Sequence, residues 1–247
     1  MSIKDLKELK IGDLIAKIPV IQGGMGVGIS LSGLASAVAN EGGIGVIASA
    51  GVGMLGHSPL KDFLESNIKT FKEEIRKARE LSKGILGVNI MVALSNFADL
   101  VKTAVEEKID VIFAGAGLPL NLPQFLNGSK KTKLVPIVSS GRAARIIAER
   151  WFKHYNYLPD AIVVEGPKAG GHLGFKPDQL SDPEYSLEKL IPEVVEEMRK
   201  FEETHKKSIP VIAAGGIYSG EDIYKFLQLG ASGVQMATRF VTTDECD

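Results

Sequence analysis

Short apolar runs recur along the whole chain, and each leads into small residues and then into a segment of helical periodicity. The runs are rich in Val, Ile and Ala and cover residues 19–24, 44–49, 85–91, 111–117, 134–139, 161–165, 210–215 and 233–238. Continuous apolar runs, unlike alternating ones, are typical of parallel strands that helices cover on both faces. The pattern therefore predicts an α/β fold in which parallel strands alternate with helices.

The segments between the runs have the periodicity of amphipathic helices. Over residues 63–81 apolar side chains recur at helical spacing among Lys and Glu, and residues 187–201 repeat the pattern. Eight parallel strands can form either an open doubly wound sheet or a closed (β/α)₈ TIM barrel. Eight such units within 247 residues favour the barrel, so we expect one domain over residues 1–247.

The end of the chain departs from the usual barrel pattern. The sequence stops at Asp247, shortly after the eighth run, so we expect the closing helix to be missing. Either the sequence is a truncated segment or another element covers that flank. The long irregular stretch over residues 166–185 is better explained as an active-site loop than as a linker.

Charge and composition exclude several classes of partner. The 29 Lys and Arg residues balance 30 Asp and Glu residues without a basic stripe, so nucleic acid is not an expected partner. Residues 18–60 carry one formal charge, but their many glycines interrupt any apolar run long enough to span a membrane. The N-terminus lacks a signal-peptide pattern, and the single cysteine, Cys246, suits a reducing compartment. We expect a cytoplasmic protein.

Several catalytic chemistries find no support in the sequence. His-Glu-x-x-His, Cys-x-x-Cys and clustered carboxylates are absent, so no metal site is expected. Cys246 lies beyond the eighth run and cannot act as a nucleophile in the sixth loop. Lys168 follows a proline in an exposed-looking loop, where the desolvation that a Schiff-base lysine needs is not expected.

Two loops indicate a phosphate site. In a TIM barrel, the loops after strands seven and eight commonly bind phosphate through backbone N–H groups. Here the seventh run leads into Gly215 and Gly216, and the eighth run contains Gln235, Met236, Ala237 and Thr238. The glycines could be there only because a tight turn needs them, but small residues in both loops favour anion binding.

The sixth loop carries the candidate catalytic residue. His172 follows Gly170 and Gly171 on a flexible stretch over the barrel mouth. Histidine titrates near neutral pH and can take a proton from a carbon acid where substrate reaches it. His57, in the loop after the second run, is a weaker alternative, whereas His154 and His205 lie in charged helical contexts.

Glycines at three further strand ends suggest a platform for a flat ring. Gly24 ends the first run and Met25 follows it, Gly87 lies in the third run, and Gly115 and Gly117 lie at the end of the fourth. Asn89, also in the third run, has an amide that can bond the edge of a heteroaromatic ring. A ring platform beside a phosphate site suggests a mononucleotide cofactor, and flavin mononucleotide (FMN) is the obvious candidate.

Five segments together resemble the nitronate monooxygenase family, formerly called 2-nitropropane dioxygenases. They are residues 22–25, 87–89, 169–172, 214–217 and 233–240, in family order along nearly the whole chain. Flavin-dependent enoyl-acyl-carrier-protein reductases and some quinone reductases share the pattern. Two positions depart from it: Ala237 stands where glycine is common, and Leu118 stands where asparagine is frequent.

The resemblance implies an FMN-dependent TIM barrel and a role for each motif residue. Met25 and Asn89 would contact the ring, and Glu165 and Gly170 match cofactor-contacting positions. The phosphate would lie against Gly215, Gly216 and the run from Gln235 through Met236 and Ala237 to Thr238. His172 matches the catalytic histidine, and a homodimer is a family-based expectation.

Three functions remain open at this stage. The leading hypothesis is oxidation of alkyl nitronates or nitroalkanes by O₂ to a carbonyl compound and nitrite, with His172 binding the nitronate or removing the α-proton. The rival is an NAD(P)H-dependent enoyl-acyl-carrier-protein reductase or quinone reductase. The third is a flavin-binding or phosphate-ligand-binding module without turnover.

Overall fold

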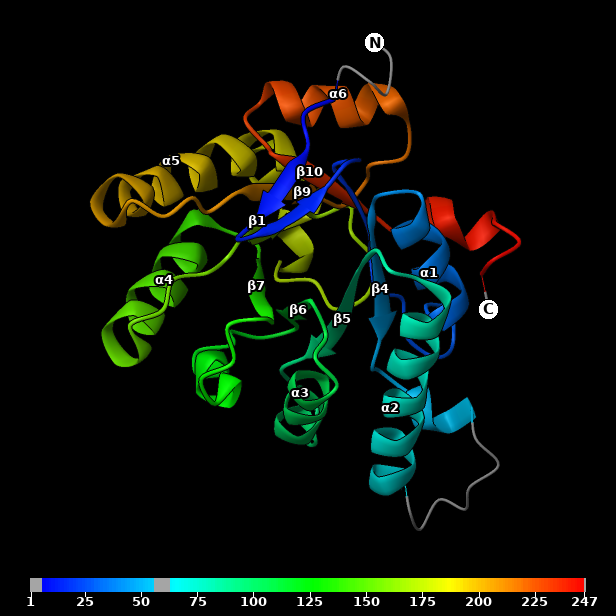
Figure 1. Ribbon diagram of the computed structural model, residues 1–247. Helices are drawn as coiled ribbons and strands as arrows, with labels where there is room; N and C mark the ends of the chain where they lie inside the picture. The colour runs from blue at the N-terminus through cyan, green and yellow to red at the C-terminus, as the bar shows by residue number, and fades with distance from the viewer. Residues whose placement is uncertain (1–5, 56–62, 247) are drawn as a thin grey trace.

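Eight parallel strands close into a barrel in the computed structural model, which describes residues 6–55 and 63–246 (Figure 1). Strand β10 pairs with β3, which closes the ring. The strands are β3 (Val20–Gln22), β4 (Ile44–Ala48), β5 (Ile85–Met91), β6 (Val111–Gly115), β7 (Lys133–Val138), β8 (Ile162–Glu165), β9 (Val211–Ala214) and β10 (Gly233–Met236). This confirms the TIM barrel and all eight predicted strands.

Several strands end earlier than the apolar runs suggested, because the backbone turns before the run is over. Ala116 and Gly117 have φ values of 53° and 132°, so β6 ends at Gly115. Gly215 has a φ of 99°, and β9 accordingly ends at Ala214. These residues therefore belong to the loops at the barrel mouth rather than to the strands.

Helices surround the barrel (Figure 1). The α-helices of the described chain are α1 (Ser32–Asn40), α2 (Phe63–Leu81), α3 (Phe97–Glu106), α4 (Gly141–Tyr155), α5 (Leu187–His205) and α6 (Gly220–Gln228). Their apolar faces pack on the outside of the strands, where Phe71 and Trp151 are fully buried. No helix in the described ranges is both long and apolar enough to cross a membrane.

Two α-helices of the ideal repeat are replaced by short 3₁₀ helices. After β6 the chain forms η4 (Leu122–Leu126), where Pro119 and Pro123 disfavour a longer helix and Asn127 turns with a φ of 46°. After β10 it forms η7 (Thr238–Thr242), and the described residues beyond it contain no α-helix.

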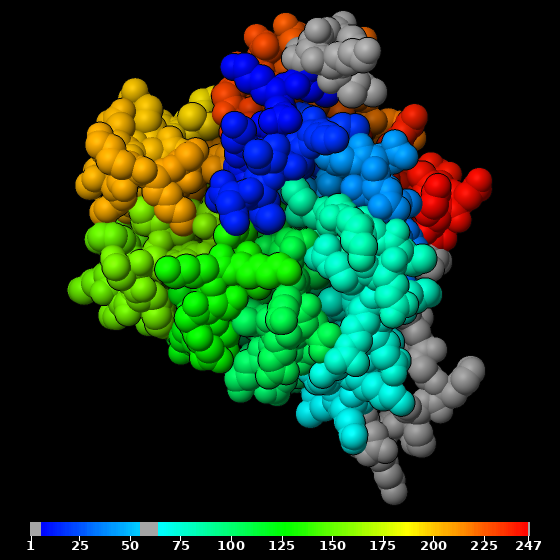
Figure 2. Space-filling view, viewed as in Figure 1, coloured from blue at the N-terminus to red at the C-terminus, as the bar shows by residue number. Residues whose placement is uncertain are grey.

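A β-hairpin that the sequence reading did not predict covers the N-terminal end of the barrel. Strands β1 (Leu9–Ile11) and β2 (Leu14–Ala16) pair antiparallel around a two-residue turn. Leu9, Ile11 and Ala16 are buried in one cluster with the residues that fill the barrel interior, such as Phe113. The hairpin lies in front of the strands in Figure 1 and forms the blue surface in Figure 2.

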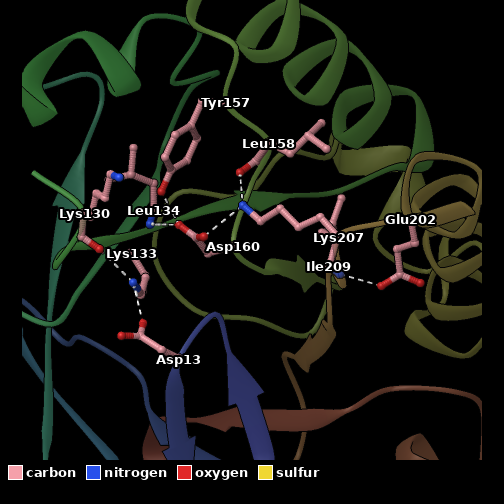
Figure 3. Close-up of polar contacts among 10 residues, drawn as sticks. All are labelled: Asp13, Lys130, Lys133, Leu134, Tyr157, Leu158, Asp160, Glu202, Lys207 and Ile209. Atoms are coloured by element: carbon pink, nitrogen blue, oxygen red, sulfur yellow. Dashed lines mark hydrogen bonds and ion pairs between the residues drawn. The ribbon is translucent and has the colours of Figure 1, made fainter. Parts of the chain in front are cut away.

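The same end of the barrel is held by buried carboxylates (Figure 3). Asp160 Oδ2 accepts hydrogen bonds from Leu134 N, at 2.9 Å, and from the Tyr157 hydroxyl. Its Oδ1 pairs with Lys207 Nζ at 2.9 Å. Burial, together with the Asp160 carboxylate, raises the pKa of Tyr157, so its hydroxyl remains a donor. Asp160 thereby ties the start of β7 to the chain leading into β8.

Asp110 makes the same kind of connection between β5 and β6. Its Oδ2 accepts from Leu86 N at 3.0 Å and pairs with Arg79 at 2.5 Å. The hairpin is joined to this end by the ion pair of Asp13 with Lys133 Nζ at 2.5 Å (Figure 3). The N-terminal end of the barrel is thus covered by ion pairs and by the buried side chains of the hairpin. We therefore look for a ligand site at the opposite end, where the strands end.

Candidate functional site

The carboxyl ends of the strands bring the predicted residues of several loops together. Gly24 packs against Asn89 so closely that a Cβ on Gly24 would lie 2.4 Å from the Asn89 Cβ. Gly23 N donates to Met236 O at 2.7 Å, which joins the first loop to the end of the eighth barrel strand. Gly166 N donates to Ala214 O at 2.9 Å, which joins the sixth loop, after β8, to the end of β9, where the seventh loop begins.

Two residues that sequence reasoning did not assign hold the first loop in place. Gln22 is fully buried; its Nε2 donates to Gly23 O and Ser30 Oγ, and its Oε1 accepts from Val46 N at 2.9 Å. Ser30 Oγ accepts in turn from Met25 N at 2.9 Å. The backbone of residues 23–25 is therefore fixed by side chains rather than by regular secondary structure, and an amide inside an apolar run was the available signal.

The loop after β9 presents backbone donors to the barrel mouth. Gly215 and Gly216 have φ values of 99° and 74°, and within the described chain their N–H groups, like those of Ala237 and Thr238, have no protein partner. A Cβ on Gly216 would lie 2.9 Å from the Lys168 Cβ, so this loop packs against the sixth loop. Lys168 thereby lies beside the unpaired donors.

The N-terminus of α6 contributes less to this site than its position suggested. Asp222 accepts from Tyr218 N at 3.1 Å and from Ser219 N at 2.8 Å, and Ser219 Oγ accepts from Asp222 N. The Asp222 carboxylate therefore already occupies the two donors just before the helix, and the Ser219 hydroxyl caps the Asp222 N–H inside it. Arg239 lies 4.8 Å from the centre of the Tyr218 ring, which places a second cation beside this loop.

Other helix N-termini are closed to anions by acidic side chains of neighbouring helices. Glu74 of α2 accepts from Ser32 N at 2.8 Å, and Glu193 of α5 accepts from Gly141 N at 2.9 Å. A second negative charge at either place would be repelled. The unpaired donors of residues 215–216 and 237–238 are therefore the better anion site.

A cavity of about 290 Å³ lies among the loops that follow β6, β7 and β8. Leu118, Ile137, Val138 and Leu173 contribute apolar walls, and Glu165 and His172 contribute the titratable groups. The structure thus brings the predicted catalytic histidine to the same cavity as Glu165. Leu118, noted in the sequence as a departure from the family pattern, lines this cavity and is 43% exposed.

Glu165 differs electrostatically from the other buried acids. It ends β8 and is partly buried, and its carboxyl group has no hydrogen bond or ion pair within the described residues. Burial raises the pKa of the Glu165 carboxyl to about 7. A carboxyl group that titrates near neutral pH can hold or release a proton under ordinary conditions.

The remaining predicted residues fall into clear groups. Asn89 and Gln235 are partly buried, and in the described part of the chain neither side chain has a hydrogen-bond partner. Gly170 and Gly171 have open space where a side chain would project. His205 lies against Phe152 in the outer helical layer, with ring centres 4.1 Å apart and the rings tilted by 46°. His57 lies outside the described residues.

A larger hollow of about 550 Å³ lies at the opposite end of the barrel, between β2 and the ends of α1 and α2. It contains none of the predicted site residues, and its charged side chains, such as Lys17 and Glu80, are of both signs. We therefore do not take the larger hollow as the candidate site, because the unpaired backbone donors and the unpaired Glu165 carboxyl lie at the other end of the barrel.

Comparison with known proteins decides the family. A family model described as nitronate monooxygenase matches residues 7–109 and 76–247, which together span nearly the whole chain. The chain belongs to the nitronate monooxygenase family. The resemblance inferred from the five sequence motifs is thereby confirmed.

Curated relatives of the chain are named for different activities. The chain is 28% identical over 230 residues to the (3aS,4S,5R,7aS)-5-hydroxy-7a-methyl-1-oxo-octahydro-1H-indene-4-carboxyl-CoA dehydrogenase of Rhodococcus jostii strain RHA1, covering 92% of the chain and 53% of the relative. It is 29% identical over 270 residues to a probable nitronate monooxygenase of Staphylococcus aureus strain Newman, covering 94% and 67%. The chain therefore spans about half the length of the first of these relatives.

Solved structures agree on the fold. FabK from Thermotoga maritima superposes with a TM-score of 0.71 at 31% identity, over 93% of this chain and 60% of that one. A nitroalkane oxidase from Streptomyces ansochromogenes superposes with a TM-score of 0.71 over 96% and 68%, and its 23% identity supports the fold alone. These similarities establish the fold but not one reaction, so the residues at the barrel mouth must distinguish among the candidate functions.

Proposed function

We propose that this chain carries the FMN site of an enzyme that oxidises alkyl nitronates or nitroalkanes with O₂ to a carbonyl compound and nitrite. The observation that carries the proposal is the meeting of two features at one barrel mouth. Unpaired backbone donors at Gly215 and Gly216 lie on one side, and a largely apolar cavity with Glu165 and His172 lies on the other. Family membership supports a flavin-dependent oxidoreductase.

The residues at the mouth fit FMN. The N–H groups of Gly215, Gly216, Ala237 and Thr238 would hold the phosphate, with Lys168 beside them to balance its charge. Gln235 and Met236 lead into this loop, in which Ala237 keeps the side chain small.

The ring would lie against the loops of the other strands. Asn89 offers an amide without a protein partner, and Gly24 and Met25 form a loop that Gln22 and Ser30 hold in place. Gly170 and Gly171 would let the sixth loop approach the cofactor closely, since they carry no side chain. Bound FMN would supply the electron acceptor that no side chain at this mouth provides.

The chain's own residues would perform the proton chemistry. His172 would take the α-proton of a neutral nitroalkane, because it lies on the cavity that a small substrate would enter. Leu118, Ile137 and Val138 would hold the alkyl group and exclude water.

A second candidate is an NAD(P)H-dependent enoyl-acyl-carrier-protein reductase. It is favoured by the 31% identity to FabK from Thermotoga maritima and by Leu118, whose apolar side chain suits an acyl chain as well as a nitroalkane. In that reaction His172 would help to protonate the reduced carbon.

Anaerobic mixing separates the two candidates. We expect an alkyl nitronate to bleach the flavin absorbance of the holoprotein rapidly and NADH or NADPH to leave it unchanged over the same time. Rapid bleaching by NADH or NADPH alone would contradict the nitronate activity and support the reductase. Inertness to all three donors would leave a binding module without turnover.

A further inference from the structure

Glu165 lacks the partners that other buried acids of this chain have. Asp110 and Asp160 each accept a backbone hydrogen bond and pair with a cation. In the described chain Glu165 has neither, although it ends β8 at the cavity wall. A carboxylate in such surroundings is poorly stabilised, so its neutral form is favoured.

The elements around Glu165 bring little charge to it. At this end of the barrel β7 contributes Ile137 and Val138, and β9 ends in Ala213 and Ala214. In the helix packed behind, α5, the acid at position 188 pairs with Lys225. Lys168 lies against Gly216, and its charge acts on Glu188. The titratable group that shares the cavity with Glu165 is His172.

We propose that Glu165, in its neutral form, is the hydrogen-bond donor for an anionic substrate of the nitronate type, and that this anion enters the cavity together with one proton. The inference rests on the proposed function and names the charge state of its substrate. Ionised Glu165 and a bound anion would repel each other inside a small apolar cavity. A neutral carboxyl instead donates its O–H to the anion in a charge-assisted hydrogen bond.

The proton comes from solvent and remains on Glu165 until the anion leaves. Anion affinity is then constant at acidic pH and falls about tenfold per pH unit once Glu165 is ionised in the free protein. Burial raises the pKa of Glu165 to about 7, so the dissociation constant rises roughly 50-fold between pH 7 and pH 9. A neutral nitroalkane does not show this loss, because it brings no charge.

Calorimetry with nitrite as a redox-inert anionic probe tests the inference directly. Nitrite is titrated into the flavin-loaded protein at pH 8 in two buffers of different ionisation enthalpy, which gives the number of protons taken up per anion. We expect close to one proton for the wild type and for His172→Asn, and none for Glu165→Gln, whose amide can still donate to the anion. Glu80→Gln, at the opposite end of the barrel, is the matched control and should behave as the wild type.

The possible results are distinguishable. Proton uptake that survives in Glu165→Gln, or that disappears in His172→Asn, overturns the inference, as does a wild-type nitrite affinity that is independent of pH or absent. This last measurement needs no variant, so it holds even where Glu165→Gln fails to fold. Protein that binds no flavin contradicts the proposed function instead, and the flavin absorbance recorded before each titration reports this separately.

Discussion

Gly24 illustrates how residue size limits the barrel mouth. A Cβ at this position would lie 2.4 Å from the Asn89 Cβ, so Gly24→Ala must displace the asparagine or the loop. We expect the free energy of unfolding to fall by about 1–3 kcal/mol, as for other overpacked sites, and flavin affinity to fall with it. Denaturant unfolding and flavin titration measure the two effects.

Gly170→Ala is the matched control for stability. An added Cβ at Gly170 meets no atom within 4 Å, and Gly170 is not among the glycines with positive φ. Its free energy of unfolding should stay within about 0.5 kcal/mol of the wild type. Equal losses in both variants would show that the contact between Gly24 and Asn89 is not the limiting one.

His172 should matter for the reaction and not for cofactor retention. His172→Ala is expected to lower turnover of a neutral nitroalkane by about 10²- to 10⁴-fold, because a general base is lost, while flavin absorbance is retained. A preformed nitronate needs no α-proton removal, so turnover of the nitronate by His172→Ala should fall less than turnover of the neutral nitroalkane. His154→Ala, on the exposed surface of α4, is the control. Full activity of His172→Ala on the neutral substrate would remove the histidine from the mechanism.

Glu165 gives the protein a specific pH dependence of stability. The pKa of its carboxyl is raised from 4.5 to about 7, so between these values the native state holds a proton that the unfolded chain has released. Wild-type stability from this group therefore falls as the pH rises toward 7 and then levels off. Relative to the wild type, Glu165→Gln should gain about 2 kcal/mol between pH 5 and pH 8. Urea unfolding of both proteins at the two pH values measures it, and parallel changes would contradict the raised pKa.

Residue types at the mouth were readable from the sequence because they follow apolar runs. Small residues after the seventh and eighth runs and His172 after the sixth all lie at the predicted end of the barrel. The amide of Gln22 stood out within an apolar run, but its role was not readable, because it depends on hydrogen bonds to Val46 in the neighbouring strand and to Ser30. The missing partners of Glu165 were equally invisible, because a sequence does not show which charges fail to meet.

At the scale of elements, the N-terminal hairpin was the main omission. Strands of three residues are too short to show a period of two, and the Gly12-Asp13 turn was the remaining signal. The α-helix expected after β6 was also wrong, because Pro119 and Pro123 disfavour a long helix and the chain forms the short 3₁₀ helix η4 instead. Long amphipathic elements such as α2 and α5 were recovered well, since many positions repeat the same pattern.

The hairpin should contribute stability without touching the cofactor. Ile11 is fully buried against the barrel interior, so Ile11→Ala is expected to cost about 2–5 kcal/mol in unfolding free energy. Ile15 lies on the same hairpin and is 51% exposed, so Ile15→Ala should cost less than about 0.5 kcal/mol. Chemical denaturation gives both values. If Ile11→Ala folds but loses much of its flavin affinity, the hairpin end of the barrel and the flavin site at the barrel mouth are not independent, which contradicts this prediction.

At the scale of the whole molecule, stabilising contacts and unpaired hydrogen-bond donors lie at opposite ends of the barrel. Asp110, Asp160 and the hairpin give the N-terminal end paired charges and buried apolar side chains. The opposite end keeps donors without protein partners at Gly215 and Gly216. This is the distribution expected when one end stabilises the fold and the other binds a ligand.

The most direct test of the account is the visible absorption spectrum of the protein after reconstitution with FMN. We predict a yellow protein that retains FMN through gel filtration, and a Gly216→Val variant that remains folded but loses most of its FMN affinity. At that position φ is 74° and a Cβ would meet Lys168 at 2.9 Å, so the branched side chain disrupts the proposed phosphate loop. A properly folded wild-type protein that stays colourless in the presence of excess FMN would contradict the central claim.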